Sequence, residues 1–148
     1  MVNLEEALAL LLGKDQNAAY RALQELQAES EASDRVYAYM DRFREMLDSP
    51  SAYIRVRGLT LLAANAKWDR DYKIDEALDE FLGHVTDPKP IAARQCVQLL
   101  PMVAQYKPEL RPEICSALHR ADLSRYKDSM RPLIARNIQK ALEDIQAL

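Results

Sequence analysis

The chain has 148 residues, which is enough for one domain with a sizeable hydrophobic core. Hydrophobic residues make up 49% of it and charged residues 29%, a balance that is typical of a globular protein. With only 3 glycines, the chain cannot form a glycine-rich loop that cradles a phosphate group. Leu, Ala, Glu, Gln and Arg are abundant, whereas β-branched and aromatic residues are few, so we expect an all-α protein.

The net charge of −3 is unevenly distributed along the chain. Residues 1–48 carry 5 basic and 10 acidic residues, a balance of −5, while residues 49–86 carry −1 and residues 87–148 carry +3. Such a gradient could orient a partner. Because no dense basic run accompanies it, we favour the simpler interpretation that surface charge varies by chance.

The N-terminal stretch argues against export. It carries Glu5 and Glu6 where a signal peptide would have basic residues, and no apolar run reaches the length of a membrane span. Cys96 and Cys115 both fall in apolar helical patterns, which favours two buried free thiols over a disulfide. We therefore expect a cytoplasmic protein with no membrane partner.

Capping residues, prolines and the spacing of apolar residues predict eight helices. Pro112 and Pro132 fall in first turns, whereas Pro101 should cost its helix a hydrogen bond and kink it. Pro50 and Pro88 each follow a capping residue, so we expect both at first helical positions. In chain order the expected helices begin at Leu4, at Asp15, after Ser33 and Asp34, at Pro50, after the polar link 68–71, at Pro88, at Pro108 and near Asp128.

An internal repeat runs through these helices. A shift of 38 residues places Pro50 on Pro88 and Leu59 on Val97, and shifts of 36 and 41 give further matches. Each repeat is a short first helix, a link opened by an aspartate and a longer second helix. We expect a single domain over residues 1–148, whose approximate units are 3–32, 33–68, 69–106 and 107–148.

In three of the repeats an arginine follows the link aspartate by six or seven residues. The pairs are Asp15 with Arg21, Asp48 with Arg55, and Asp87 with Arg94, while in the fourth repeat Asp128 is followed by Ala135, with Arg136 one place late. Over nearly the whole chain this pattern resembles the HEAT-repeat (armadillo-like) superfamily. The resemblance implies a short right-handed α-solenoid of about four helical hairpins, roughly eight helices, in which aspartates and arginines form a ladder and second helices line a concave face.

No catalytic or metal-binding motif stands out. His84 and His119 each lie near the end of a first helix, where the helix dipole favours histidine, and no nucleophile accompanies either. The sequence has no Cys-x-x-Cys, no His-Glu-x-x-His and no carboxylate-rich calcium loop. We expect no enzyme activity, no metal and no cofactor.

The second helices supply the candidate partner-binding surface. Arg55 and Arg57 lie about 200° apart on a helix, so by its spacing from Asp48 we assign Arg55 to the ladder and Arg57 to the surface. Trp68 is a residue typical of interaction hot spots, although covering the edge of a hairpin is its simpler role. The candidate surface consists of Arg57, Asn65, Trp68, Arg94, Gln95, Gln98 and Arg136.

The sequence thus favours a non-enzymatic scaffold or adaptor that binds a protein or peptide on the face of the second helices, with the partner and the oligomeric state left open. One alternative is a nucleic-acid-binding protein that resembles DNA glycosylases. The pI of about 5.4 and the lack of a dense basic stripe argue against it, while the positive C-terminal third keeps it open. Another is a lyase-like enzyme, for which no nucleophile or acid can be identified.

Overall fold

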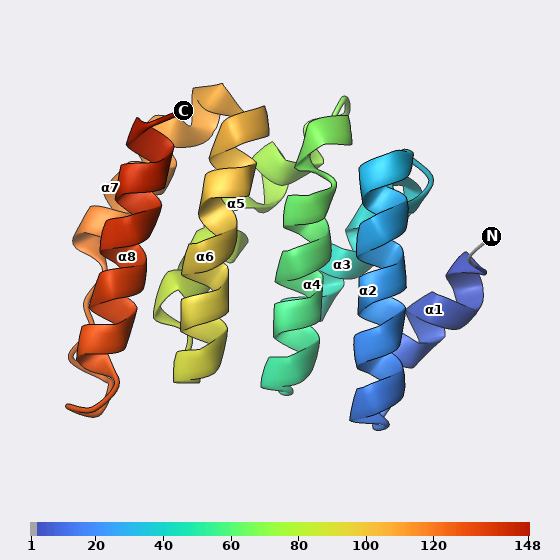
Figure 1. Cartoon of the computed structure of the whole chain (residues 1–148), viewed down its shortest axis with the longest axis horizontal. Helices are drawn as coiled ribbons and strands as arrows, with labels where there is room; N and C mark the ends of the chain where they lie inside the picture. Colours follow the sequence, from blue (N-terminus) through green and yellow to red (C-terminus); the bar gives the residue numbers. More distant parts are fainter. Residues whose placement is uncertain (1–2) are drawn as a thin grey trace. The chain divides into compact units, whose positions relative to one another are not determined.

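The structure is a computed structural model that describes residues 3–148. These residues form eight α-helices and four short 3₁₀ helices and contain no strand, which confirms the all-α class (Figure 1). The α-helices are α1 Leu4–Leu11, α2 Gln16–Ala32, α3 Met40–Met46, α4 Ala52–Ala64, α5 Lys73–Gly83, α6 Pro90–Tyr106, α7 Arg111–Arg120 and α8 Arg131–Gln146. The chain divides into two compact units, Met1–Lys73 and Ile74–Leu148, which we call the N-terminal and C-terminal units.

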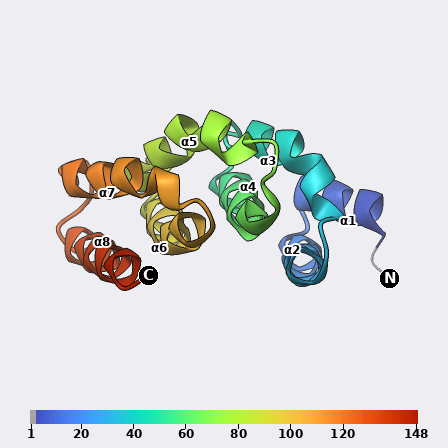
Figure 2. The same ribbon diagram turned by 90° about the horizontal axis from the view of Figure 1, so that it is seen from above.

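The N-terminal unit contains two helical hairpins. Its first helices, α1 and α3, lie in one layer, and its second helices, α2 and α4, lie in another (Figure 2). Helix α1 packs on α2, α3 packs on α4, and the two second helices lie side by side and run in the same direction (Figure 1). The core between them is filled by the fully buried side chains of Leu11, Leu26, Phe43, Leu59 and Leu62.

The C-terminal unit repeats this plan. Helix α6 packs along α8 and also contacts α7 and the short 3₁₀ helix His84–Thr86 that follows α5. Fully buried Leu100, Ile114 and Ile134 belong to its core. Tyr126, in the loop between α7 and α8, packs against Ile134 and donates a hydrogen bond of 2.6 Å from its hydroxyl to the carbonyl of Asp87. This contact fixes the long loop against the start of α6.

Side-chain caps set the first two helix starts. The side chain of Asn3 accepts a hydrogen bond from the backbone N–H of Glu6, and that of Asp15 accepts one from the N–H of Ala18. Each cap satisfies an N–H group that has no partner inside the helix. Both starts agree with the sequence prediction.

Two predicted helix starts are wrong, for the same reason. Ser51 rather than an earlier residue caps α4, so Pro50 precedes the helix instead of opening it. The side chain of Asp87 accepts from the N–H of Lys89, which forms a turn ahead of α6, and Pro90 rather than Pro88 lies at the first helical position. In both places a polar side chain closes a turn before the helix begins.

The remaining predictions concern three prolines, the start of α8 and the two cysteines. Pro112 and Pro132 lie in the first turns of α7 and α8, as predicted, and α6 runs on through Pro101. Helix α8 begins at Arg131, later than the predicted start near Asp128. Both cysteines are free thiols; Cys96 is buried, but Cys115 is half-buried, which corrects the expectation that both are buried.

Gly58 marks the closest approach of α4 to α3. A Cβ atom placed on Gly58 would lie 2.7 Å from the carbonyl oxygen of Phe43 and 2.9 Å from Cβ of Met46. Neither atom can move without shifting the backbone of α3. Only glycine allows the two helices to pack at this distance.

We expect Gly58→Ala to destabilise the protein by about 1–3 kcal/mol, because the overpacking penalty exceeds the gain in helix propensity. Gly83→Ala is the matched control, since Gly83 ends α5 in a right-handed helical conformation and a Cβ there meets nothing within 4 Å. That variant should gain roughly 0.5–1 kcal/mol. Urea unfolding measures both values. Equal effects of the two substitutions would contradict the close approach at Gly58.

Candidate partner-binding surface

Arg57 joins the two hairpins of the N-terminal unit. It lies in the middle of α4 and is only 6% exposed. Its Nη1 donates a 2.8 Å hydrogen bond to the carbonyl of Leu11 at the end of α1, and its Nη2 donates to Oε1 of Gln16 at the start of α2. The prediction that Arg57 lies on the surface is therefore wrong. Most of this side chain is buried against the turn of the first hairpin.

The charge of Arg57 has no carboxylate partner within residues 3–148, since both of its acceptors are neutral. Burial lowers the pKa of the guanidinium, and the nearby Tyr53 opposes this shift. The ring of Tyr53, one helical turn earlier, has its centroid 6.0 Å from the guanidinium carbon. Arg57 is thus a partly desolvated cation held by neutral groups.

Asn65 and Trp68 connect α4 to the C-terminal end of α2. Asn65 is fully buried, and its Nδ2 donates to Ser30 Oγ at 3.1 Å and to the carbonyl of Leu61 at 2.9 Å. The half-buried Trp68 donates from Nε1 to the carbonyl of Ser30 at 2.7 Å. Asn65 is therefore not a surface residue, contrary to the prediction. Trp68 covers the end of the first hairpin, the simpler of its two roles.

The link 69–72 is held by Tyr37. The Tyr37 hydroxyl donates to Asp69 Oδ1 at 2.8 Å and accepts from the backbone N–H of Asp71 at 3.0 Å. Arg70 lies over the Tyr37 ring, 4.9 Å from its centroid. These contacts fix the backbone of Tyr72 with φ at 58°, a left-handed conformation that costs a bulky residue about 1–2 kcal/mol.

In the C-terminal unit Arg94 makes the corresponding contact between second helices. Its Nε on α6 donates to Oδ1 of Asn137 on α8 at 2.8 Å, and no carboxylate pairs with it among the described residues. Gln95 and Gln98 are exposed on α6, as predicted, and Gln98 lines a hollow of about 310 Å³ with Asn137 and Lys140. Arg94, Gln98 and Asn137 therefore lie together.

Arg136, the last candidate of this unit, is exposed on α8. Its Nε donates weakly, at 3.4 Å, to the carbonyl of Pro132 one turn earlier in the same helix. Among the described residues it forms no hydrogen bond with Arg94 or Gln98. Within residues 3–148 Arg136 is therefore available to solvent, on a different face from Asn137, the residue that follows it.

The structure does not pair the link aspartates with the arginines that follow them in the same repeat. No ion pair forms in the described part of the chain between Asp15 and Arg21, Asp48 and Arg55, or Asp87 and Arg94. Asp15 is used as a helix cap, and Arg55 donates to the carbonyls of Ser49 and Pro50 at 3.0 and 3.2 Å.

His84 and Cys96, two residues with catalytic potential, each contact another protein group. His84 Nδ1 lies 2.7 Å from Oδ2 of the buried Asp87, just after α5. Cys96 is fully buried and donates from Sγ to the carbonyl of Phe81 at 3.3 Å. Burial raises the pKa of this thiol well above its ordinary value, with Asp87 adding to the shift, so the nucleophilic thiolate is disfavoured. His119 is exposed in the last turn of α7.

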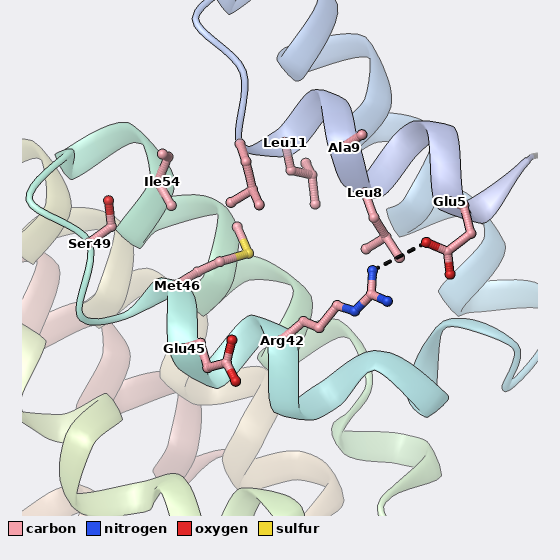
Figure 3. Close-up of a pocket in the computed structure, with 10 residues that line it drawn as sticks. Glu5, Leu8, Ala9, Leu11, Arg42, Glu45, Met46, Ser49 and Ile54 are labelled. Carbon is pink, nitrogen blue, oxygen red and sulfur yellow. Dashed lines mark hydrogen bonds and ion pairs between the residues drawn. The ribbon is translucent and has the colours of Figure 1, made fainter.

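An apolar hollow of about 310 Å³ lies between α1 and α3 in the N-terminal unit (Figure 3). Leu8, Met46 and Ile54 line it, and an ion pair of 3.3 Å between Glu5 and Arg42 crosses its edge. Both charged side chains are exposed, so the pair contributes little energy. No sequence pattern indicates this hollow, because its walls come from separate helices whose spacing only the fold defines.

Two exposed tyrosines lie on second helices but are not among the residues of the predicted surface. Tyr20 on α2 and Tyr53 on α4 are 59% and 63% exposed. Both lie at positions of second helices that fall outside the buried apolar stripe, and this signal was present in the sequence. A large aromatic residue at a solvent-facing helical position is a better indicator of a contact surface than a central arginine.

No protein-family model, curated protein or solved structure matches this chain. Within residues 3–148 no helix is both long and apolar enough to cross a lipid bilayer. The same residues contain no group of three or more His, Cys, Asp or Glu side chains arranged to hold a metal ion. The candidate surface is therefore judged from its own geometry.

The Tyr37 contacts give a prediction on pH. Burial, followed by the hydrogen bond to Asp69, raises the pKa of Tyr37 from 10.0 to about 12. In the unfolded chain this phenol loses its proton at the lower value, so the stability that neutral Tyr37 contributes falls as pH rises from about 10 to about 12.

Ultraviolet titration of phenolate in the folded wild type and in Tyr37→Phe measures this shift. The difference between the two curves should be one group that ionises near pH 12. A difference curve with its midpoint near 10 would contradict the described hydrogen bonds.

Proposed function

We propose that this chain is a non-enzymatic protein-interaction module, built as a short HEAT-like solenoid, that binds a protein or peptide along its second helices. The observation that carries the proposal is the exposure of large apolar side chains on these helices. The exposed residues are Tyr20 on α2, Tyr53 on α4, and Ile91, Met102 and Tyr106 on α6. Exposed apolar and aromatic groups that gather on one kind of element are typical of protein contact surfaces.

Polar groups on the same helices support the proposal. Gln95 and Gln98 are exposed, and Arg94 donates a hydrogen bond to the neutral amide of Asn137. Amide side chains can both donate to and accept from the backbone of a bound peptide. Arginine is enriched in protein interfaces because its planar group forms several directed hydrogen bonds.

The surroundings of Cys96 and His84 support a non-enzymatic role. The only fully buried thiol of the described chain, Cys96, is held protonated, and His84 is engaged by Asp87. The free state of both Cys96 and Cys115 fits a reducing compartment, so we place the proposed module in the cytoplasm.

The proposal is tested by site-specific photo-crosslinking in cells. A benzophenone amino acid at Gln98, exposed on second helix α6, should form crosslinks to a protein partner, whereas the same group at Ser116, exposed on first helix α7, should not. The affinity of the captured partner is then measured with purified proteins. Met102→Ala should raise the Kd roughly tenfold and Ser116→Ala should leave it unchanged.

Crosslinks that form only from Ser116 would contradict the second-helix surface. Crosslinks from Gln98 to nucleic acid rather than to protein would contradict the interaction with a protein partner.

A further inference from the structure

A second property of the N-terminal unit follows from the arrangement around Arg57. We infer that Arg57, Gln16, Tyr20 and Tyr53 form a site for a carboxylate side chain of an acidic peptide segment. We call these four residues the Arg57 site. The inference rests on the proposed function and specifies the chemistry of the partner that the second helices of the N-terminal unit accept.

The four residues come together from two neighbouring helices. Gln16 and Tyr20 are one turn apart on α2, and Tyr53 and Arg57 are one turn apart on α4, so each pair shares a face of its helix. The hydrogen bond from Arg57 Nη2 to Gln16 Oε1 joins the two faces. Gln24 donates to the Tyr20 hydroxyl at 3.1 Å, which orients that ring on α2.

Some N–H groups of the Arg57 guanidinium have no acceptor in the structure. It carries five N–H donors, and the structure gives acceptors to two of them, Leu11 O and Gln16 Oε1. Side-chain atoms that are fully buried and lack a hydrogen-bond partner do occur within residues 3–148, for example Asn65 Oδ1. Nε of Arg57 is not among them and has no acceptor, so it keeps contact with solvent and can receive a ligand oxygen.

A carboxylate is the ligand that best suits the free donors and the charge of Arg57. A partly desolvated cation with neutral acceptors gains more from an anion than an exposed cation does, because the local dielectric constant is lower. Carboxylates match the planar fork of arginine with short, charge-assisted hydrogen bonds. The exposed hydroxyl and ring of Tyr53 add a donor and an apolar surface beside the same point.

The neighbouring charges favour an acidic peptide. Lys14 and Arg21 are exposed on either side of the start of α2, and neither forms an ion pair within the described residues. Asp15 lies between them, but its carboxylate is already hydrogen-bonded as the cap of α2. At the start of α2, from which Gln16 contacts Arg57, two cations without an ion pair therefore accompany one carboxylate.

The same charges disfavour nucleic acid. Residues 1–73 carry 10 basic and 12 acidic residues, a net charge of −2. A polyphosphate backbone needs a row of several cations, and here Glu25 follows Arg21 by one turn. Isolated carboxylates spaced along a peptide suit the site better than a continuous phosphate chain.

The test uses the full chain and two blocked peptides, one alternating Ala and Glu and the other alternating Ala and Gln. The probe signal is the side-chain Nε–H resonance of Arg57 in a nitrogen–proton NMR correlation spectrum. The Ala-Glu peptide should shift this resonance and the backbone amides near Gln16, and the Ala-Gln peptide should leave both in place.

Two variants and one control locate the effect. Arg57→Lys keeps the charge but removes the forked donors, so it should weaken binding of the Ala-Glu peptide by about tenfold or more. Tyr53→Phe removes one exposed hydroxyl without altering the core and should weaken it roughly threefold to tenfold. Arg42→Gln, at an exposed arginine of first helix α3, should leave the affinity unchanged.

Equal shifts with the Glu and Gln peptides would overturn the carboxylate inference and leave the second-helix interface standing. Absence of any shift at Arg57 would also overturn it, while crosslinking from Gln98 in the other unit tests the proposed function independently. A shift of the Arg57 resonance by duplex DNA in place of the acidic peptide would overturn it in favour of a phosphate ligand.

Discussion

In the N-terminal unit, the packing of the second hairpin on the first depends on where the Arg57 guanidinium lies. From the middle of α4 it reaches the last carbonyl of α1 and the first side chain of α2, which places three helix segments around one group. The carbonyl of Leu11 would otherwise be one of the unpaired acceptors at a helix end. Because a charged donor satisfies it, removal of Arg57 would leave both a buried acceptor and a cavity. The position of α2 beside α4 follows from this constraint.

In the C-terminal unit, too, a hydrogen bond from an arginine joins two neighbouring second helices. Arg94 on α6 bonds to Asn137 on α8, so in both units an arginine of one second helix is held by an amide of its neighbour. Neutral acceptors fix the position of each guanidinium without neutralising its charge. An Asp–Arg pair would have cancelled that charge within the protein. Because both acceptors are neutral amides, the charges of Arg57 and Arg94 remain available to the proposed acidic partner.

The sequence predicted the helices well because their signals are local. Caps such as Asn3 and Asp15, and the spacing of apolar residues, act within a few positions, and the all-α class followed from composition. The predictions from sequence were wrong where tertiary contacts determine whether a side chain is buried. Arg57 and Asn65 look like surface residues, but their hydrogen bonds to Leu11 and Ser30 lie 46 and 35 residues away in the chain. No periodic pattern encodes such partners. The sequence therefore singled out Arg57 and Asn65 as polar residues of interest, but it did not indicate the groups that bury them.

Whether the neutral side chain of Gln16 holds Arg57 in place can be measured with a double-mutant cycle between Arg57→Ala and Gln16→Ala. Urea unfolding of the wild type, the two single variants and the double variant gives the coupling free energy. We expect a coupling free energy of about 1–3 kcal/mol that stays constant as salt is added, since Gln16 carries no charge. A coupling near zero, or one that declines with salt as an ion pair would, contradicts it.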